Sequence, residues 1–362
     1  MLRKASTLLA LILVSAVASG CAGAPPGDKA GGAGGGPVVL RMASTAGDLD
    51  NIPPVAEFVQ RADVLSGGTL QIKVINQWGD WAPDAEAQAV RAVGAGTVDL
   101  GWAGSRVFDT IGVPGLRALS APMLIDSYPL ENAVLHGAMP GRMLAGLASV
   151  HVTGLGMLGE GLRLPISTQR PLLTPADWRG VSFGTYRSQV QEQAIRAVGA
   201  TPVVAFGPVR NHDLGTGQIQ GFELDLRRYV EMGLVSEARH VAANVALWPQ
   251  FDVLFANPGR LASLTAQQRA WLQQAANEAT TDSVGLTSDN VTYIGQACAK
   301  GARFVNATPA DLAALRRALS VVYQHLQADP QTRAFIQQIQ RLKNSTPAGP
   351  APRIPAGCTR EP

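Results

Sequence analysis

Residues 178–189, WRGVSFGTYRSQ, have the pattern of a short apolar strand that ends at Gly184 and leads directly into a helix. Val181 and Phe183 alternate with less apolar neighbours, as in a strand with one buried face. The following residues predict a helix over 186–198. In α/β proteins, ligands bind where strands end and helices begin. The stretch therefore predicts an α/β protein with a binding site at this edge of a sheet.

Strand and helix patterns alternate on both sides of this stretch. Residues 38–43 and 69–76 have the alternating pattern of strands, and a helix that begins at Pro53 lies between them. After Gly259 the pattern becomes helical, with one long helix expected from Ser263 towards Ala297. This order of elements indicates open α/β sheets followed by a helical C-terminal part.

Further C-terminal helices are expected to begin at Pro309 and at Pro330.

Two internal sequence echoes suggest two lobes of related design. AVRAVGA at residues 89–95 recurs as AIRAVGA at residues 194–200, and GAGTVDLG at 94–101 resembles GTGQIQG at 215–221. Each copy of the first echo has the pattern of a helix that ends at a glycine and is followed by Val-rich chain. Each copy of the second has the pattern of a helix end, a glycine turn and a short apolar strand. Pairs of this kind predict that the chain builds the same unit twice.

The strands that follow the second echo end at two residues of interest, Trp102 and Glu223. We expect both side chains to face the space between the two lobes. Aromatic side chains such as Trp102, Tyr186 and Trp248 are candidates for a ligand-binding surface, and plain core packing is the alternative for each.

Composition limits the classes of partner. The chain has 362 residues, of which 46% are hydrophobic and 16% charged, which is enough to bury a core in each of two lobes. The formal net charge is +3, and no stripe of lysine and arginine appears. A nucleic-acid partner is therefore not expected.

The N-terminus has the features of an export signal. Arg3 and Lys4 precede an apolar run that ends in VASGC, where small residues stand just before Cys21. This pattern predicts a lipoprotein signal peptide over residues 1–20, lipidation of Cys21 and a flexible glycine-rich tether over residues 21–37. The alternative is a plain secretory signal with a chance cysteine. The predicted location is the extracytoplasmic face of a bacterial membrane.

Two further cysteines, Cys298 and Cys358, stand near the C-terminus. In an exported protein they predict one disulfide that joins the Pro-rich tail, residues 343–362, to the body of the protein. Two unpaired thiols are the alternative. Their spacing does not match a metal site.

Catalytic motifs are scarce in this sequence. No nucleophile elbow, HExxH helix or phosphate-binding loop is present, and the five histidines are scattered without ligand spacing. GLGMLG at residues 154–159 matches a dinucleotide-binding pattern, but Pro165 follows too soon for the helix that such a loop needs. We read this segment as a glycine-rich inner strand and expect neither an enzyme nor a cofactor or metal.

Arg163 lies at the end of this apolar strand, where an arginine can bind a carboxylate with two parallel hydrogen bonds. A structural ion pair with Glu160 or Glu223 is the alternative.

Several segments, in the same order, resemble the solute-binding subunit of tripartite ATP-independent periplasmic (TRAP) transporters. They are GAGTVD (94–99), APMLID (121–126), LTPADWRG (173–180), VGATPV (198–203), LGTGQIQG (214–221), LTAQQRAWLQQAANEA (264–279) and VVY (321–323). The resemblance covers roughly residues 38–342.

This resemblance implies a two-lobed, periplasmic-binding-protein-like α/β fold with a cleft between the lobes, crossing strands and a long helix that spans both. The expected boundaries are 38–160 for lobe I, completed by about 249–288, and 161–248 for lobe II, completed by about 289–342. It also implies capture of a small organic acid and delivery to TRAP-type membrane permease subunits. A ligand-sensing receptor lipoprotein that acts on a membrane sensor is the alternative function, and an exported enzyme is a third.

The resemblance assigns a ligand-holding role to Arg163, but the principal carboxylate-binding arginine of the family is replaced by Gly184. Glu223 is kept. Three outcomes follow from this departure. Arg187 takes over the role of the missing arginine, or a ligand approaches the backbone at Gly184 and the amides that open the next helix. Alternatively, the ligand is neutral or cationic and is held by Glu223 and aromatic side chains such as Tyr186.

Overall fold

Ten strands of the described residues, 36–349 and 351–359, form one continuous mixed sheet in this computed structural model. The strands are β1 (Val38–Ala43), β2 (Leu70–Ile75), β3 (Leu100–Gly104), β4 (Thr153–Ser167), β5 (Ser182–Thr185), β6 (Thr201–Val204), β7 (Gly221–Leu224), β8 (His240–Ala242), β9 (Trp248–Ala256) and β10 (Arg303–Val305). Their order is β2-β1-β3-β9-β4-β7-β5-β6, and β8 joins β4 to β10. The predicted signal peptide over 1–20 and the lipidation site at Cys21 lie outside the described residues.

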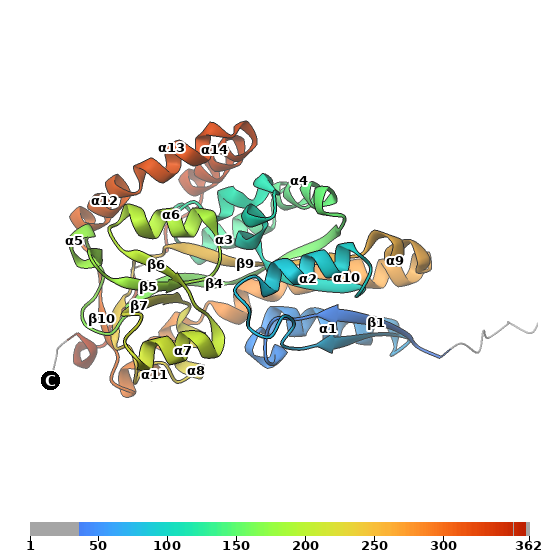
Figure 1. Cartoon of the computed structure of the whole chain (residues 1–362), viewed down its shortest axis with the longest axis horizontal. Helices are drawn as coiled ribbons and strands as arrows, with labels where there is room; N and C mark the ends of the chain where they lie inside the picture. Colours follow the sequence, from blue (N-terminus) through green and yellow to red (C-terminus); the bar gives the residue numbers. More distant parts are fainter. Residues whose placement is uncertain (1–35, 350, 360–362) are drawn as a thin grey trace, which may run out of the picture. The chain divides into compact units, whose positions relative to one another are not determined.

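Helices cover both faces of the sheet (Figure 1). The α-helices are α1 (Pro53–Ser66), α2 (Ala85–Gly94), α3 (Tyr128–Leu135), α4 (Met139–Ala145), α5 (Pro175–Trp178), α6 (Gln189–Ala197), α7 (Gly207–Gly215), α8 (Leu226–Glu231), α9 (Pro258–Ser263), α10 (Ala266–Thr287), α11 (Asn290–Ala299), α12 (Pro309–Ala318), α13 (Ser320–Ala328) and α14 (Pro330–Ser345). The 3-10 helices are η1 (Leu49–Asn51), η2 (Ser105–Thr110), η3 (Pro114–Ser120), η4 (Gly146–Val150) and η5 (Ala356–Cys358). No helix in the described part of the chain is both long and apolar enough to cross a membrane.

Two long strands, β4 and β9, connect the two halves of the sheet. The first part of β4 pairs antiparallel with β9, from Thr153 opposite Ala256 to Arg163 opposite Trp248. The last part of β4 pairs with β7 instead. The register shifts between Gly159 and Leu162, so the strand bends where it passes from one partner to the next. These are the crossing strands that the family resemblance implies.

Each half of the sheet has its own apolar core. In the first lobe, buried side chains of β1 and β3 pack with those of α1 and α10. In the second lobe, those of β7, β8 and β10 pack with α8 and α11. A third cluster, which includes α6 and α14, lies across both. The two-lobed α/β class predicted from the sequence is confirmed, while the exact lobe boundaries stay a prediction.

Local sequence signals explain most element ends. Helix α1 starts with Pro53 and Pro54 and ends at Gly67, whose left-handed backbone (φ 57°) suits glycine. The single helix expected from Ser263 to Ala297 is wrong, because it divides into α10 and α11. Asp289 caps the second helix by accepting a hydrogen bond from the amide of Thr292 and so begins a new helix there.

The helix expected from Pro309 is likewise divided, into α12 and α13, with the break at Leu319.

A disulfide joins Cys298 at the end of α11 to Cys358 in η5, with their Cα atoms 5.5 Å apart. Cys358 is buried in the apolar core of the second lobe, and Ile354 packs against the same core. The bond therefore holds the C-terminal segment against this lobe.

Candidate functional site

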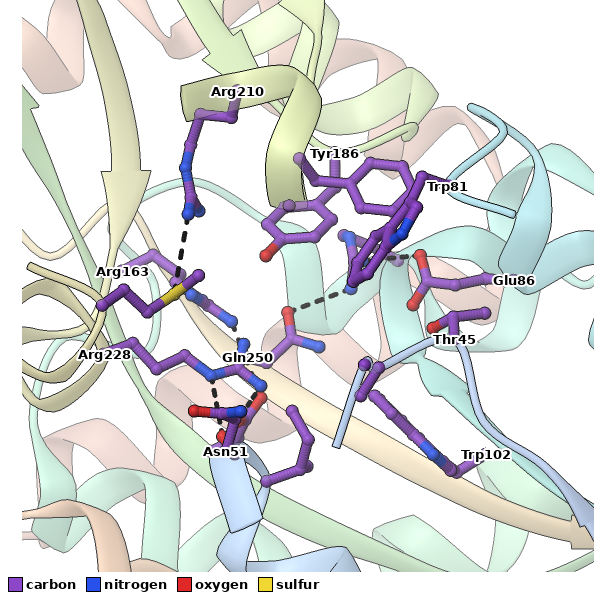
Figure 2. A pocket seen from close by; sticks show the side chains of 18 residues that line it. Thr45, Asn51, Trp81, Glu86, Trp102, Arg163, Tyr186, Arg210, Arg228 and Gln250 are labelled. Carbon is purple, nitrogen blue, oxygen red and sulfur yellow. Dashed lines mark hydrogen bonds and ion pairs between the residues drawn. The ribbon is translucent and has the colours of Figure 1, made fainter. Parts of the chain in front are cut away.

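A cavity with an empty volume of about 680 Å³, open solvent at its mouth included, lies between the two lobes (Figure 2). The lining residues come from segments far apart in the sequence: Thr45, Ala46, Gly47, Asn51, Ile52, Trp81, Glu86, Trp102, Arg106, Glu160, Arg163, Tyr186, Phe206, Gly207, Arg210, Arg228, Met232 and Gln250.

Arg106 lies in η2, directly after strand β3, and both of its terminal nitrogens bind neighbouring side chains. Its Nη2 atom lies 2.6 Å from Oε2 of Glu86, and Nη1 donates to Oε1 of Gln250 over 3.0 Å. Gln250 in turn donates to Asp252. The guanidinium carbon lies 4.1 Å from the ring centre of Tyr186, a cation–π contact.

Arg163 on β4 is surrounded by carboxylates. Its guanidinium nitrogens lie 3.3 Å from Asp225, 3.6 Å from Glu160 and 3.9 Å from Glu223, and the side chain is 1% exposed. A buried charge of this kind is tolerated because opposite charges surround it. The structural ion pairs that the sequence left open as an alternative are therefore present.

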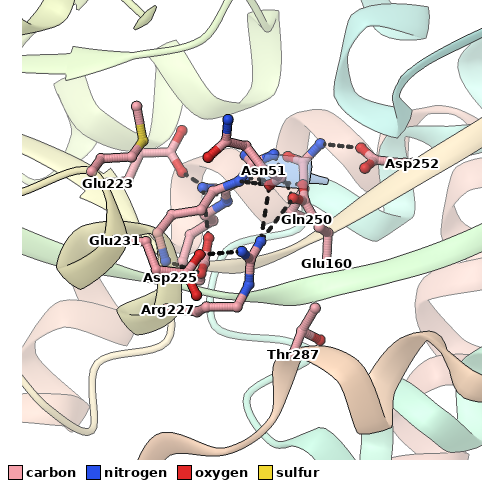
Figure 3. Close-up of polar contacts among 12 residues, drawn as sticks. Asn51, Glu160, Glu223, Asp225, Arg227, Glu231, Gln250, Asp252 and Thr287 are labelled. Atoms are coloured by element: carbon pink, nitrogen blue, oxygen red, sulfur yellow. Dashed lines mark hydrogen bonds and ion pairs between the residues drawn. The ribbon is translucent and has the colours of Figure 1, made fainter. Parts of the chain in front are cut away.

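Helix α8 contributes a pair of arginines to this network (Figure 3). Arg228 forms an ion pair with Glu160, and Arg227 lies 3.7 Å from the same carboxylate. Both also donate to the main-chain carbonyl of Asn51 in η1, over 3.0 Å from Arg227 and 3.3 Å from Arg228. These bonds link the first lobe to the second. Burial raises the pKa of Glu160, and the neighbouring Arg228 lowers it in part.

Arg210, in the first turn of α7, differs from the other three arginines of the cavity. It is 2% exposed and donates only to Oδ1 of Asn211 (3.2 Å) and to the sulfur of Met232 (3.6 Å). Among the described residues no carboxylate lies within 4.0 Å of it, and burial lowers its pKa. Its charge is thus buried without a neutralising partner, an arrangement that costs free energy unless an anion binds there.

Aromatic side chains form one wall of the cavity. The rings of Tyr186 and Phe206 stack with centres 5.5 Å apart, and Trp81 lies 6.2 Å from Phe206. Trp81 belongs to a loop of the first lobe, whereas Tyr186 and Phe206 belong to the second (Figure 2). The wall therefore spans both lobes.

Comparison with known proteins identifies a family and a shared fold. The model of bacterial extracellular solute-binding protein family 7 matches residues 52–329, about three quarters of the chain. The chain belongs to this family. Its members are solute-binding proteins, and the recognition made from the sequence segments is confirmed.

Curated relatives are distant. The C4-dicarboxylate-binding periplasmic protein DctP of Rhodobacter capsulatus is 25% identical over 189 residues, 52% of this chain and 55% of that protein. A solute-binding protein of Chromohalobacter salexigens is 25% identical over 231 residues, 63% of this chain and 68% of that protein. The match thus spans little more than half of the Rhodobacter relative.

Solved structures agree in fold over nearly their whole length. A TRAP periplasmic solute-binding protein from Ralstonia eutropha H16 with bound (S)-2-acetolactate has a TM-score of 0.77 and 18% identity, covering 85% of this chain and 99% of that one. One from Chromohalobacter salexigens with bound D-glucuronate has a TM-score of 0.74 and 21% identity, covering 84% and 99%. At these identities the comparison establishes the fold.

The candidate ligand residues of this family 7 chain fall into three groups. Trp102, Arg163 and Tyr186 line the cavity. Glu223 and Trp248 are buried beside the cavity without lining it, and they bond to each other through the indole nitrogen and Oε2 over 3.1 Å.

Arg187 is exposed and does not line the cavity, and its replacement of the missing family arginine stays a prediction.

Gly184 is not part of the cavity either. A Cβ atom at this position would lie 2.8 Å from Cδ1 of Ile219, so the position faces the interior of the second lobe. The backbone amides that open α6 are also occupied. Asp109 accepts from the amides of Gln189 and Val190, each over 3.1 Å, and from the hydroxyl of Ser188. In the alternative in which a ligand uses these amides, it would have to replace Asp109.

Arg106, Arg210 and Arg228 were not anticipated from the sequence. Each follows the end of a strand by two to six residues: Arg106 follows β3, Arg210 follows β6 and Arg228 follows β7. The general preference for ligand sites at carboxyl ends of strands is a signal that would have selected them. Among the described residues no group of three or more His, Cys, Asp or Glu side chains is placed to hold a metal ion.

Proposed function

We propose that this family 7 protein captures a small organic anion outside the cytoplasm and delivers it to a TRAP-type membrane permease. The observation that carries the proposal is Arg210, a buried guanidinium of the cavity with no carboxylate within 4.0 Å among the described residues. A ligand carboxylate at this position would supply the missing opposite charge.

Unpaired hydrogen-bond donors support an anionic occupant. Buried nitrogens without a hydrogen-bond partner belong to Trp102 (Nε1), Arg106 (Nε), Arg163 (Nε and Nη2) and Arg210 (Nε), and all four side chains line the cavity. Unsatisfied donors favour a ligand that is rich in acceptors, as carboxylates are. A cationic ligand would instead face four arginines.

The relatives add support of the same kind. The ligands bound in the two solved structures, (S)-2-acetolactate and D-glucuronate, are both carboxylates, and the Rhodobacter relative is named for C4-dicarboxylates. We extend this chemical class to the present chain. We further propose lipid anchoring through Cys21, the lobe boundaries predicted from the sequence, and a purely binding role without catalysis.

Replacing Arg210 by glutamine tests the proposal. Binding of organic acids to the purified protein is measured by calorimetry, first with a broad panel of carboxylates. Loss of a charge-assisted bidentate contact is expected to weaken binding of the tightest acid by roughly 1.5–3 kcal/mol, about 10- to 150-fold. The matched control is Arg187→Gln, because Arg187 is exposed, lies on the same lobe and does not line the cavity.

A second readout separates binding from folding. Because Arg210 is buried without an acidic partner, its removal is expected to leave the melting temperature of the ligand-free protein unchanged or raise it. Equal affinity of R210Q and wild type for every acid that binds would contradict the role of Arg210. If no carboxylate of the panel binds the wild-type protein at all, the proposed function itself fails.

A further inference from the structure

We infer that the ligand is a monocarboxylate with a flat, apolar, aromatic body, rather than a polyhydroxylated acid or a dicarboxylate. This inference rests on the proposed function and narrows it to one chemical class. Three independent features of the cavity carry it: the number of uncompensated charges, the use of its acceptors and the aromatic wall.

The charge of the cavity calls for one anionic group. Three of its four arginines have a carboxylate of this chain within 4.0 Å: Arg106 has Glu86, Arg163 has Asp225 and Arg228 has Glu160. Only Arg210 has none within the described residues. A second ligand carboxylate would have to displace an internal, buried ion pair, which costs several kcal/mol. One anionic group is therefore the best match.

Several acceptors of the cavity are already in use. Oε1 of Glu86 accepts from the amide of Gly104 over 2.8 Å, and Oε2 lies against Arg106. Oε1 of Gln250 also accepts from Arg106, and Glu160 is ion-paired with arginines. A sugar acid presents several hydroxyl donors that each need an acceptor once buried. A polyhydroxylated acid would therefore bury more hydroxyl donors than a flat apolar acid does, and each donor needs an acceptor.

The remaining surface of the cavity suits an aromatic ring. Trp81, Phe206 and Tyr186 form the continuous wall described above, and Trp102 lines the cavity as well. Aromatic rings prefer stacked or edge-to-face contacts with other rings, which add about 0.5–1.5 kcal/mol beyond burial.

The loop that carries Trp81 has an energetically unfavourable backbone conformation. Its own backbone has φ 60°, and Asp80 and Gln77 in the same loop also have positive φ values. Such conformations cost energy for residues other than glycine and persist where surrounding structure imposes them. The indole packs against Gly207, where a Cβ atom would lie 2.6 Å from it. This strain is consistent with a binding role for the ring.

Calorimetry with four acids of similar size tests the inference. The probes are 3-phenylpropionate, its saturated counterpart 3-cyclohexylpropionate, D-glucuronate and the dianion phenylmalonate. The expected order places 3-phenylpropionate first, about tenfold or more ahead of D-glucuronate and phenylmalonate, with 3-cyclohexylpropionate a few-fold weaker because it lacks the ring contacts.

Variants of Trp81 locate the effect in the cavity. Trp81→Ala is expected to weaken 3-phenylpropionate about tenfold and Trp81→Phe to restore most of the loss, since the ring contact is regained without the indole. Trp271→Ala is the control, because this tryptophan of α10 does not line the cavity.

The outcomes distinguish the two levels of the proposal. Two results would overturn the aromatic monocarboxylate class but leave anion binding intact. One is that D-glucuronate or phenylmalonate binds as tightly as 3-phenylpropionate. The other is that Trp81→Ala leaves the affinity for 3-phenylpropionate unchanged. If none of these acids and no other carboxylate binds, both this inference and the proposed function fail.

Discussion

Arg163 and Arg210 show how the surroundings of a residue decide its role. Both are buried arginines of one cavity, but three carboxylates lie within 4.0 Å of Arg163 and none of the described ones lies that close to Arg210. Removal of Arg163 would leave buried carboxylates without their counter-charge, so a binding defect in that variant would be mixed with loss of stability. Arg210 is for this reason the cleaner probe of the site.

Glu131 on α3 predicts a pH dependence of stability. It is fully buried, and burial raises its pKa from 4.5 to about 8. The folded protein therefore holds a proton on this group that the unfolded chain releases above about pH 4.5. Its contribution to stability is complete at low pH and is lost as the pH rises through about 8.

Replacing Glu131 by glutamine is expected to remove this share of the pH dependence, because an amide does not titrate. Urea unfolding at about pH 5 and about pH 8 measures it: the stability of the variant relative to wild type should rise with pH. Glu237→Gln, at an exposed position, should leave the pH dependence as it is. A parallel pH profile for wild type and E131Q would show that Glu131 titrates normally.

At the scale of elements, the 3-10 helix η2 connects the cavity with α6. Arg106 of this helix points into the cavity, while Asp109 three residues later accepts three hydrogen bonds from the start of α6. The start of α6 is thus capped by the carboxylate of another element in addition to its own Ser188. We regard η2 as the support that orients Arg106.

Asp109→Ala is expected to lower the free energy of unfolding by about 2–3 kcal/mol, since three hydrogen bonds to a buried carboxylate are lost. Asp329→Ala gives the comparison, because Asp329 caps α14 within its own segment, and a loss of about 1 kcal/mol is expected there. Chemical denaturation measures both. If both variants lost the same free energy of unfolding, the contact of Asp109 with a second element would add no stability beyond that of an ordinary helix cap.

For the whole molecule, the contacts across the cavity favour a closed arrangement of the lobes. Trp81 of the first lobe packs on Gly207 of the second, and the carbonyl of Asn51 accepts from Arg227 and Arg228. Each contact involves few groups, so the balance between open and closed arrangements is expected to depend on the ligand.

Gly207→Ala tests this closure. The added methyl group would lie 2.6 Å from the indole of Trp81 and would push it away, in a backbone conformation (φ 56°) that already favours glycine. We expect ligand affinity to fall about tenfold or more and the compaction that ligand produces in small-angle scattering to shrink.

Gly215→Ala, at the other end of α7 with nothing within 4 Å, is the control. Wild-type affinity and compaction in G207A would show that the Trp81–Gly207 contact has no part in closure.

The sequence by itself determined the α/β class and much of the element order, because these depend on local periodicity, caps and turns, and the family was indicated by the resemblance of several segments in order. Strand β1 has the predicted bounds, and α1 begins at the predicted Pro53. Arg163, Tyr186 and Trp102 were also predicted to be near the ligand, and they line the cavity.

Only the tertiary structure decided the charge and the walls of the site. Whether an arginine is free or paired depends on carboxylates distant in the chain: Glu86 for Arg106, Asp225 for Arg163, and none within the described residues for Arg210. Residue spacing does not predict such ion pairs, because they form when separate strand ends meet between two lobes. Gly184 and the exposed Arg187 do not line the cavity, whereas arginines from other elements do.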